Sequence, residues 1–111
     1  MIYYRQGDVV IKKVNAPKNM PKKKVNRSSD GMLVLAEGEV SGHRHRIKQI
    51  RAEMFDIGNG SSGGGLAFLL KVEKTAMLLH EEHDTIAIPP GFYEIYHQRE
   101  YPPAEIKRVV D

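Results

Sequence analysis

The chain has 111 residues, enough for one hydrophobic core but too few for two, so we expect a single domain over residues 1–111. Apolar residues make up 41% and charged residues 28%, which excludes a disordered protein, and the lack of cysteine excludes disulfides, thiolate metal sites and a cysteine nucleophile. The net charge of +3 is unevenly spread, because residues 1–60 carry twelve Lys and Arg against six Asp and Glu, whereas residues 61–111 carry five against eight.

We expect no targeting or membrane-spanning segment in this sequence. The start, MIYYRQGDVV, becomes charged before any apolar run develops, which argues against a signal peptide. The longest apolar stretch is LAFLL at 66–70, far short of a membrane span. We therefore expect a cytoplasmic protein, bacterial or viral, with no membrane contact.

Short apolar or alternating segments separated by turn residues run through the chain, a pattern typical of strands, and no long helix is predicted. The expected strand segments are 8–14, 32–39, 43–50, 52–57, 66–73, 75–83, 85–88 and 92–99. Residues 15–31 and the glycine-rich 58–65 are expected to be loops, the second a flexible hairpin connection. The predicted fold class is all-β, a small antiparallel β-barrel or sandwich.

Two parts of this predicted fold, one turn and the C-terminal tail, each have two possible structures. Pro90 and Gly91 suit the central positions of a type II turn, so the strands on either side should either pair or turn a barrel corner. The tail YPPAEIKRVVD is expected to add a short C-terminal helix from Ala104, because proline is tolerated just before a helix, or else to form an edge strand.

The segment GEVSGHRHRI, residues 38–47, places two histidines two residues apart. In a strand, His43 and His45 lie on one face while Arg44 and Arg46 lie on the other. Two imidazoles about 6 to 7 Å apart at their Cβ atoms can converge on one ion or one anionic group. The alternative is a pair of surface histidines with no ligand.

The three remaining histidines widen this candidate site. The sequence HEEHD places His80 and His83 around Glu81 and Glu82, and His97 follows in the last expected strand. The spacing is not the helical H-E-x-x-H pattern, and the preceding AMLL favours a strand followed by a turn. Imidazole and carboxylate suit Zn, Fe, Ni or Mn, so the predicted ligands are His43, His45, His80, His83 and His97. The alternative is an acidic loop whose histidines only titrate.

GHRHR followed by IPPGFYEIYH resembles the two motifs of the cupins, small jelly-roll barrels, over residues 38–97. That resemblance implies His43, His45 and His97 as metal ligands on facing strands. Period-2 geometry also lets Glu94 replace His97 as the ligand of the second motif.

The segments RQGDVVI, LAEGEVSGHRHRI, LLHEEHDTIAIPPGFYEIYHQREY and IKRVVD together resemble a family of short bacterial and phage-related proteins of unassigned function. The resemblance covers almost the whole chain and implies one shared design, which is either a site or a fold-stabilising polar network. Its members would be Gln6, Gly7, Asp8, His43, His45, His80, Glu82, His83, Gln98, Arg99, Glu100 and Tyr101.

Three functions compete at this point. The first is a metal-binding β protein in which, if it is catalytic, Glu82 or Glu94 would move a proton. The second is a phage-related module that contacts protein or nucleic acid through the Lys-rich segment 12–27 and the Arg44 and Arg46 stripe. The third is a barrel that binds a small anion through His43, His45 and Arg99. Assembly into a homo-oligomer is an open expectation.

Overall fold

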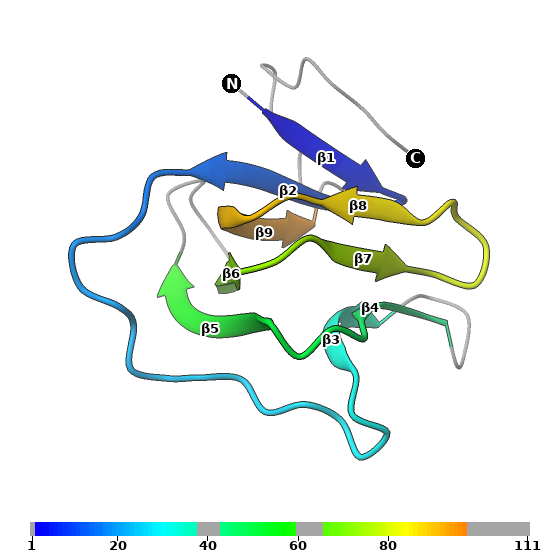
Figure 1. The fold of residues 1–111 in the computed structure, drawn as a ribbon, viewed down its shortest axis with the longest axis horizontal. Helices are drawn as coiled ribbons and strands as arrows, with labels where there is room; N and C mark the ends of the chain where they lie inside the picture. Colours follow the sequence, from blue (N-terminus) through cyan, green and yellow to red (C-terminus); the bar gives the residue numbers. More distant parts are fainter. Residues whose placement is uncertain (1, 38–42, 60–65, 98–111) are drawn as a thin grey trace.

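A computed structural model describes residues 2–37, 43–59 and 66–97, with side chains described throughout except at positions 59, 66, 67 and 97. Within these ranges the chain forms nine strands and no helix (Figure 1). Accordingly, the described part holds no helix of the length and apolarity that crossing a membrane requires. The strands are β1 (Tyr3–Gln6), β2 (Val9–Val14), β3 (Leu33–Glu37), β4 (Arg44–Ile47), β5 (Ala52–Asn59), β6 (Leu66–Val72), β7 (Ala76–Leu79), β8 (Ile86–Ile88) and β9 (Gly91–His97).

The strands form two antiparallel sheets. One has five strands in the order β1-β2-β9-β6-β5, and the other has four in the order β3-β4-β7-β8. The alternation of buried and exposed residues along β7 and β8 turns one apolar row of each strand inward. The predicted all-β sandwich is thus confirmed, whereas a closed barrel is not formed.

The hydrophobic core lies between the two sheets. Val9, Ile11 and Leu70 from the first sheet belong to the same buried cluster as Ile47 and Leu78 from the second. Each of these five side chains is fully removed from solvent. Burying an aliphatic side chain of this size stabilises the fold by about 1.5–3 kcal/mol, so this layer holds the sheets together.

The corner between β8 and β9 takes the chain from one sheet to the other. β8 pairs with β7, and β9 pairs with β2 and β6, so the strands flanking Pro90 turn a corner and do not pair. Gly91 has φ +152°, away from the roughly +80° of a type II turn, so the predicted turn type is wrong. The Tyr93 hydroxyl donates a hydrogen bond to the Pro89 carbonyl at 2.6 Å, which braces the corner.

One strand was missed by the sequence prediction, and another is shorter than predicted. β1 was not predicted, since YYRQ alternates too briefly to be recognised, but it pairs with β2 in register from Tyr3 opposite Lys12 to Gln6 opposite Val9. The expected strand 43–50 is shorter and ends at Ile47. β5 and β6 pair as antiparallel neighbours, as the expected hairpin requires, but β5 extends to Asn59, so the predicted start of the loop at residue 58 is wrong. Residues 60–65 of that loop lie outside the described residues. The proposed C-terminal helix or edge strand lies outside the described residues.

Candidate metal site

Three separate segments meet at one end of the sandwich. They are the turn between β1 and β2, the start of β4, and the connection between β7 and β8. Together they bring four histidines into contact, and we call His43, His45, His80 and His83 the imidazole cluster. Ring centroids are 4.3 Å apart for His45 and His80, and 4.7 Å for His80 and His83. The outer distances are 5.6 Å for His43 and His80, and 6.1 Å for His45 and His83.

The alternation along β4 selects which histidine is buried. His45 and Ile47 face inward, and the His45 side chain is 3% exposed, whereas Arg44 and Arg46 lie on the other face. His43 precedes the strand, and its side chain is 22% exposed. The predicted division of histidines and arginines between two faces is therefore confirmed, with His43 at the rim and His45 at the base of the imidazole cluster.

A buried glutamine fixes the ring of His45. The Gln6 side-chain amide nitrogen donates to the carbonyls of Leu78 at 3.0 Å and Asp84 at 2.9 Å, so the amide oxygen must act as acceptor. That oxygen lies 2.8 Å from Nδ1 of His45. Nδ1 of His45 therefore carries a proton, and in the neutral ring the lone pair is on Nε2. Nε2 faces the Asp8 carboxylate at 3.7 Å.

The connection after β7 is a turn, as the sequence predicted, and it fixes a second ring. The backbone N–H of Glu82 donates to Nδ1 of His80 at 3.0 Å. Nδ1 of His80 is therefore an acceptor, so the neutral ring holds its proton on Nε2. Burial lowers the pKa of His80, and the neighbouring His83 lowers it further because two nearby imidazolium charges repel.

Glu81 joins the turn to β4. One of its carboxylate oxygens accepts the backbone N–H of Arg44 at 2.9 Å, and the other lies 3.1 Å from the Arg46 guanidinium. The hydrogen bond from Arg44 is the main reason that the pKa of Glu81 lies below its usual value. Glu81 is therefore ionised at neutral pH and is held beside the rim of the imidazole cluster.

The lack of a side chain at Gly7 leaves room for the His83 ring. It has φ +60°, and a Cβ at this position would lie 2.7 Å from Nε2 of His83. Only glycine adopts this backbone conformation without strain and lets an imidazole approach so closely. The turn between β1 and β2 therefore presses against the imidazole cluster and places Asp8 next to it.

Among the described residues, one group has the geometry of a metal site: His43, His80 and Glu81. Each offers one ligand atom, and these atoms all lie within 4.8 Å of one another. Two imidazoles and a carboxylate form a set that binds zinc with one or more positions left for water. This group lies at the rim of the imidazole cluster and includes Glu81, a carboxylate that the sequence analysis noted between His80 and His83 but did not count among the predicted ligands.

Not every predicted site residue falls in this site. Glu82 lies near it, with a carboxylate oxygen 3.8 Å from Nδ1 of His43. Glu94 lies between buried Tyr93 and buried Ile95 in β9, so it points away from the core. The side chain of His97 and all of Arg99 lie outside the described residues. Gln6, Gly7 and Asp8 contact the imidazole cluster, and only the family resemblance in the sequence had grouped them with it.

Arg44 and Arg46 bind acidic neighbours in the structure. Arg44 lies 2.6 Å from Asp30, which strongly lowers the pKa of that carboxyl, and Arg46 pairs with Glu81. Their positive charges are therefore largely balanced within the fold. Contact of either arginine with an external anion stays a prediction.

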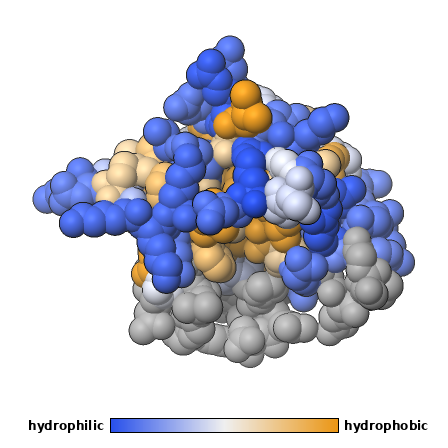
Figure 2. All heavy atoms as spheres, turned by 90° about the horizontal axis from the view of Figure 1, so that it is seen from below, coloured by the Kyte–Doolittle hydropathy of each residue, from blue (hydrophilic) through white to orange (hydrophobic). Residues whose placement is uncertain are grey.

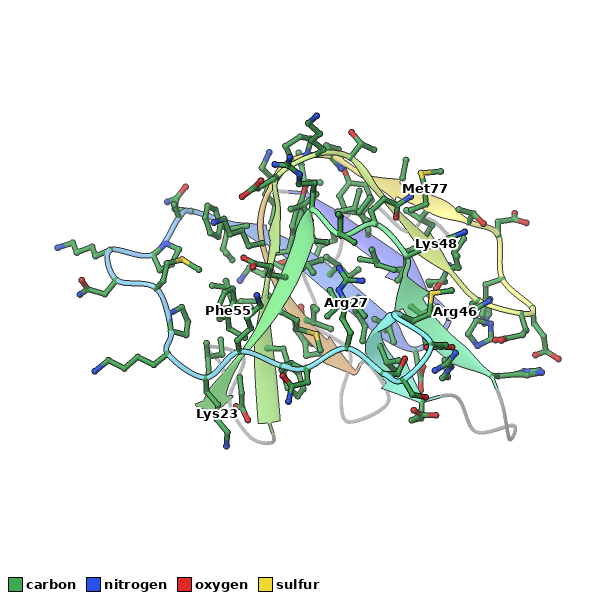
Figure 3. The ribbon with its side chains drawn as sticks, turned by 60° about the horizontal axis from the view of Figure 1, so that its bottom comes forward. Lys23, Arg27, Arg46, Lys48, Phe55 and Met77 are labelled. Atoms are coloured by element: carbon green, nitrogen blue, oxygen red, sulfur yellow. The ribbon has the colours of Figure 1, made fainter. Side chains whose placement is uncertain are left out.

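The Lys-rich segment 12–27 begins in β2, and its residues 23–25 lie along β5, an edge strand of the first sheet. Figure 3 shows Arg27 at the centre of this face, with Lys23 and Phe55 on one side and Arg46 and Lys48 on the other. Lys24 lies 2.7 Å from Glu53, and Lys23 is 3.8 Å from Asp56. Arg27 donates to the backbone carbonyls of four residues, Gly31, Lys48, Gln49 and Ala52.

The surface on this side is mostly hydrophilic, with hydrophobic residues visible between the charged ones (Figure 2). Ile50 is 80% exposed, and it lines a shallow hollow beside Arg27 and Leu33. Three of the seven basic residues of the segment, Lys23, Lys24 and Arg27, thus attach it to β5 and to the turn before it. Binding of nucleic acid or protein by this segment stays a prediction.

Comparison with known proteins identifies a family whose function is unknown. No curated protein matches the chain, and no solved structure matches it. A family model described as Domain of unknown function (DUF8820) matches residues 5–98, which contain β1 to β9 almost entirely and all four members of the imidazole cluster. Because the match covers most of the chain, the protein belongs to the family of the Domain of unknown function (DUF8820).

Proposed function

We propose that this protein binds a divalent transition metal ion through His43, His80 and Glu81. The observation that carries the proposal is the convergence of one ligand atom from each residue within 4.8 Å. The ionised Glu81 supplies a negative charge, and the low pKa of His80 keeps its imidazole neutral at physiological pH, as a ligand must be. The donor set suits zinc, iron, nickel or manganese.

The ion would hold water as well as protein. Three protein ligands leave at least one coordination position of the ion open for water. The metal ion lowers the pKa of a water molecule bound there. Glu82, whose carboxylate is 3.8 Å from His43, is the acidic side chain at this rim that is not in the ligand set. Among the described residues, Glu82 is therefore placed to accept a proton from that water.

Metal binding at His80 has a structural consequence. A metal on Nδ1 replaces the Glu82 N–H as partner of that lone pair, while a metal on Nε2 moves the ring proton to Nδ1. In both cases Nδ1 stops accepting the hydrogen bond from Glu82. The proposal therefore links ion binding to a change at the Glu82 amide.

Calorimetric titration of untagged, chelator-treated protein with zinc tests the proposal. We expect binding in the wild type and at least a roughly 10–100-fold weaker affinity in Glu81→Gln, the loss known for residues that support metal ligands. Glu73→Gln is the matched control, because Glu73 pairs with exposed Arg51 outside the cluster. The Glu82 amide resonance should shift on zinc addition. No zinc binding by the wild type, or equal affinity in all three proteins, would refute the proposal.

A further inference from the structure

A guanidinium lies beside the proposed metal ion at the rim of the imidazole cluster. Arg46 Nη1 is 3.1 Å from a carboxylate oxygen of Glu81, and Figure 3 shows Arg46 near the yellow connection between β7 and β8 that carries Glu81. The Arg46 side chain is 19% exposed and that of Glu81 33%, so solvent reaches both. Arg46 is not itself a metal ligand, because a guanidinium keeps its proton and offers no lone pair. An ion bound to Glu81 therefore has a fixed positive charge next to it.

Arg46 keeps donors for a ligand. The contacts that described residues make with its guanidinium, one with Glu81 and one with the Arg44 carbonyl at 2.9 Å, both use Nη1. A guanidinium has five N–H donors in a planar fork, which matches the oxygens of a carboxylate or a phosphate. The donors on Nη2 and Nε therefore remain for an oxyanion that approaches the rim.

The charge of the rim changes sign when a divalent ion binds. In the metal-free protein, the positive charge of Arg46 stands against the carboxylates of Glu81 and Glu82. The pair of Arg44 and Asp30, at 2.6 Å, adds no net charge. These five groups sum to −1, which disfavours an anion. A divalent ion brings the sum to +1, and the attraction for an anion is stronger here than between fully exposed charges because the rim is partly shielded from water.

The distances let one anion contact both the ion and Arg46. Zinc lies about 2.0–2.2 Å from a carboxylate ligand oxygen, so an ion on the Glu81 oxygen next to Arg46 would be at most about 5.3 Å from Nη1. One anion oxygen at about 2.0–2.2 Å from the ion and a second at about 2.7–2.9 Å from a guanidinium nitrogen cover this separation. The open coordination position supplies the first contact, and the fork of Arg46 supplies the second.

We propose that the metal-loaded rim binds a small oxyanion, with one oxygen on the ion and another on the Arg46 guanidinium. The ligand class is a carboxylate or a phosphate-like group, which share this pair of acceptor oxygens. The inference rests on the proposed function, because the ion at His43, His80 and Glu81 supplies the first contact. By linkage, the ion and the anion raise each other's affinity by the same factor. Anion binding is therefore metal-dependent.

NMR titration of the zinc-loaded full chain with three small probes tests this inference. Sulfate is a tetrahedral dianion that stands in for phosphate without precipitating zinc, acetate is a carboxylate, and acetamide is the uncharged counterpart of acetate. We expect the side-chain resonances of His43 and Arg46 to titrate with sulfate or acetate, but not with acetamide, and not in metal-free protein. The anion that binds more tightly identifies the ligand class.

A matched pair of variants tests the part played by Arg46. In Arg46→Gln, the anion affinity at saturating zinc, followed on the His43 ring, should fall at least about 10-fold, because a charge-assisted hydrogen bond is lost. Arg51→Gln is the control, since Arg51 pairs with Glu73 at an exposed position outside the cluster, and it should keep the wild-type affinity.

The outcomes separate this inference from the proposed function. Zinc binding without any response to sulfate or acetate overturns the oxyanion site and leaves the metal site. Equal anion affinity with and without zinc, or in Arg46→Gln and the wild type, also overturns the oxyanion site. No zinc binding overturns both. If Arg46→Gln fails to bind zinc, calorimetry of the wild type decides: its zinc affinity must rise when sulfate or acetate is added, and an unchanged zinc affinity refutes the inference.

Discussion

Gln6 and His45 form a buried hydrogen bond of 2.8 Å that connects the last residue of β1 to the middle of β4. The Gln6 amide also holds two backbone carbonyls of the β7 to β8 region. A single side chain therefore links the two sheets and orients the base of the imidazole cluster. The stability of the fold and the geometry of the candidate site depend on the same residue.

Replacement of Gln6 should be costly. Gln6→Leu removes an acceptor from His45 and a donor from two carbonyls, and each buried polar group left without a partner costs about 1–3 kcal/mol. We expect a loss of about 2–4 kcal/mol in the free energy of unfolding, measured in urea without metal. Gln49→Leu is the control, since Gln49 accepts one exposed hydrogen bond from Met77, and it should lose less than about 1 kcal/mol. Similar losses in both variants would contradict this assignment.

The close approach of Gly7 to His83 gives a second prediction. Gly7→Ala introduces both backbone strain at φ +60° and a contact of 2.7 Å with the His83 ring. Gly31→Ala introduces strain alone, because nothing lies within 4 Å of a Cβ there, at a cost of about 1–2 kcal/mol. Thermal unfolding should show a larger loss for Gly7→Ala. In a His83→Ala background, which lacks the imidazole, the two glycine substitutions should cost about the same. A difference that persists there would show that contact with the His83 ring does not cause the extra loss in Gly7→Ala.

The low pKa of His80 predicts a pH dependence of stability. The unfolded chain takes up this proton near pH 6.5, whereas the folded chain takes it up at lower pH. Between these two pH values the unfolded state binds more protons, so the free energy of unfolding falls as the pH falls through that window. In metal-free protein, urea midpoints from pH 7.5 to 5 should fall less steeply for His80→Asn than for the wild type. Identical slopes would show that His80 does not contribute.

Arg27 is predicted to be a structural residue. Its guanidinium reaches the carbonyls of Gly31, Gln49 and Ala52, a geometry that the single ammonium of lysine does not reproduce. Arg27→Lys should reduce the free energy of unfolding by about 1–3 kcal/mol. Arg51→Lys, at an exposed pair with Glu73, is the control and should change it by less than about 1 kcal/mol. If Arg27→Lys lowers the free energy of unfolding no more than Arg51→Lys does, Arg27 does not have this structural role.

Much of the fold was predictable because strand patterns are local. Segments such as VVIKKV and LAFLLKV have enough apolar residues to be recognised alone, and each forms a strand close to its predicted bounds. The division of strands into two sheets was not predictable, because it depends on pairing between residues far apart, as for β2 with β9. The β1 strand was missed because four residues with two polar positions give too weak a pattern.

The site was predictable in its residue types but not in its partners. Four histidines separated by up to forty residues meet because β4 and β7 are neighbours in one sheet. The parts played by Gln6 and Glu81 depend on hydrogen bonds across strands, which sequence spacing does not encode. The resemblance to cupins and the phage-related origin stay predictions.

The most direct test of the account is anomalous X-ray scattering at the zinc absorption edge from crystals soaked in zinc. The account predicts a peak bonded to His43, His80 and Glu81, at about 2.0–2.2 Å from their ligand atoms. Crystals whose zinc peaks all lie outside the imidazole cluster, or that show none, would contradict it.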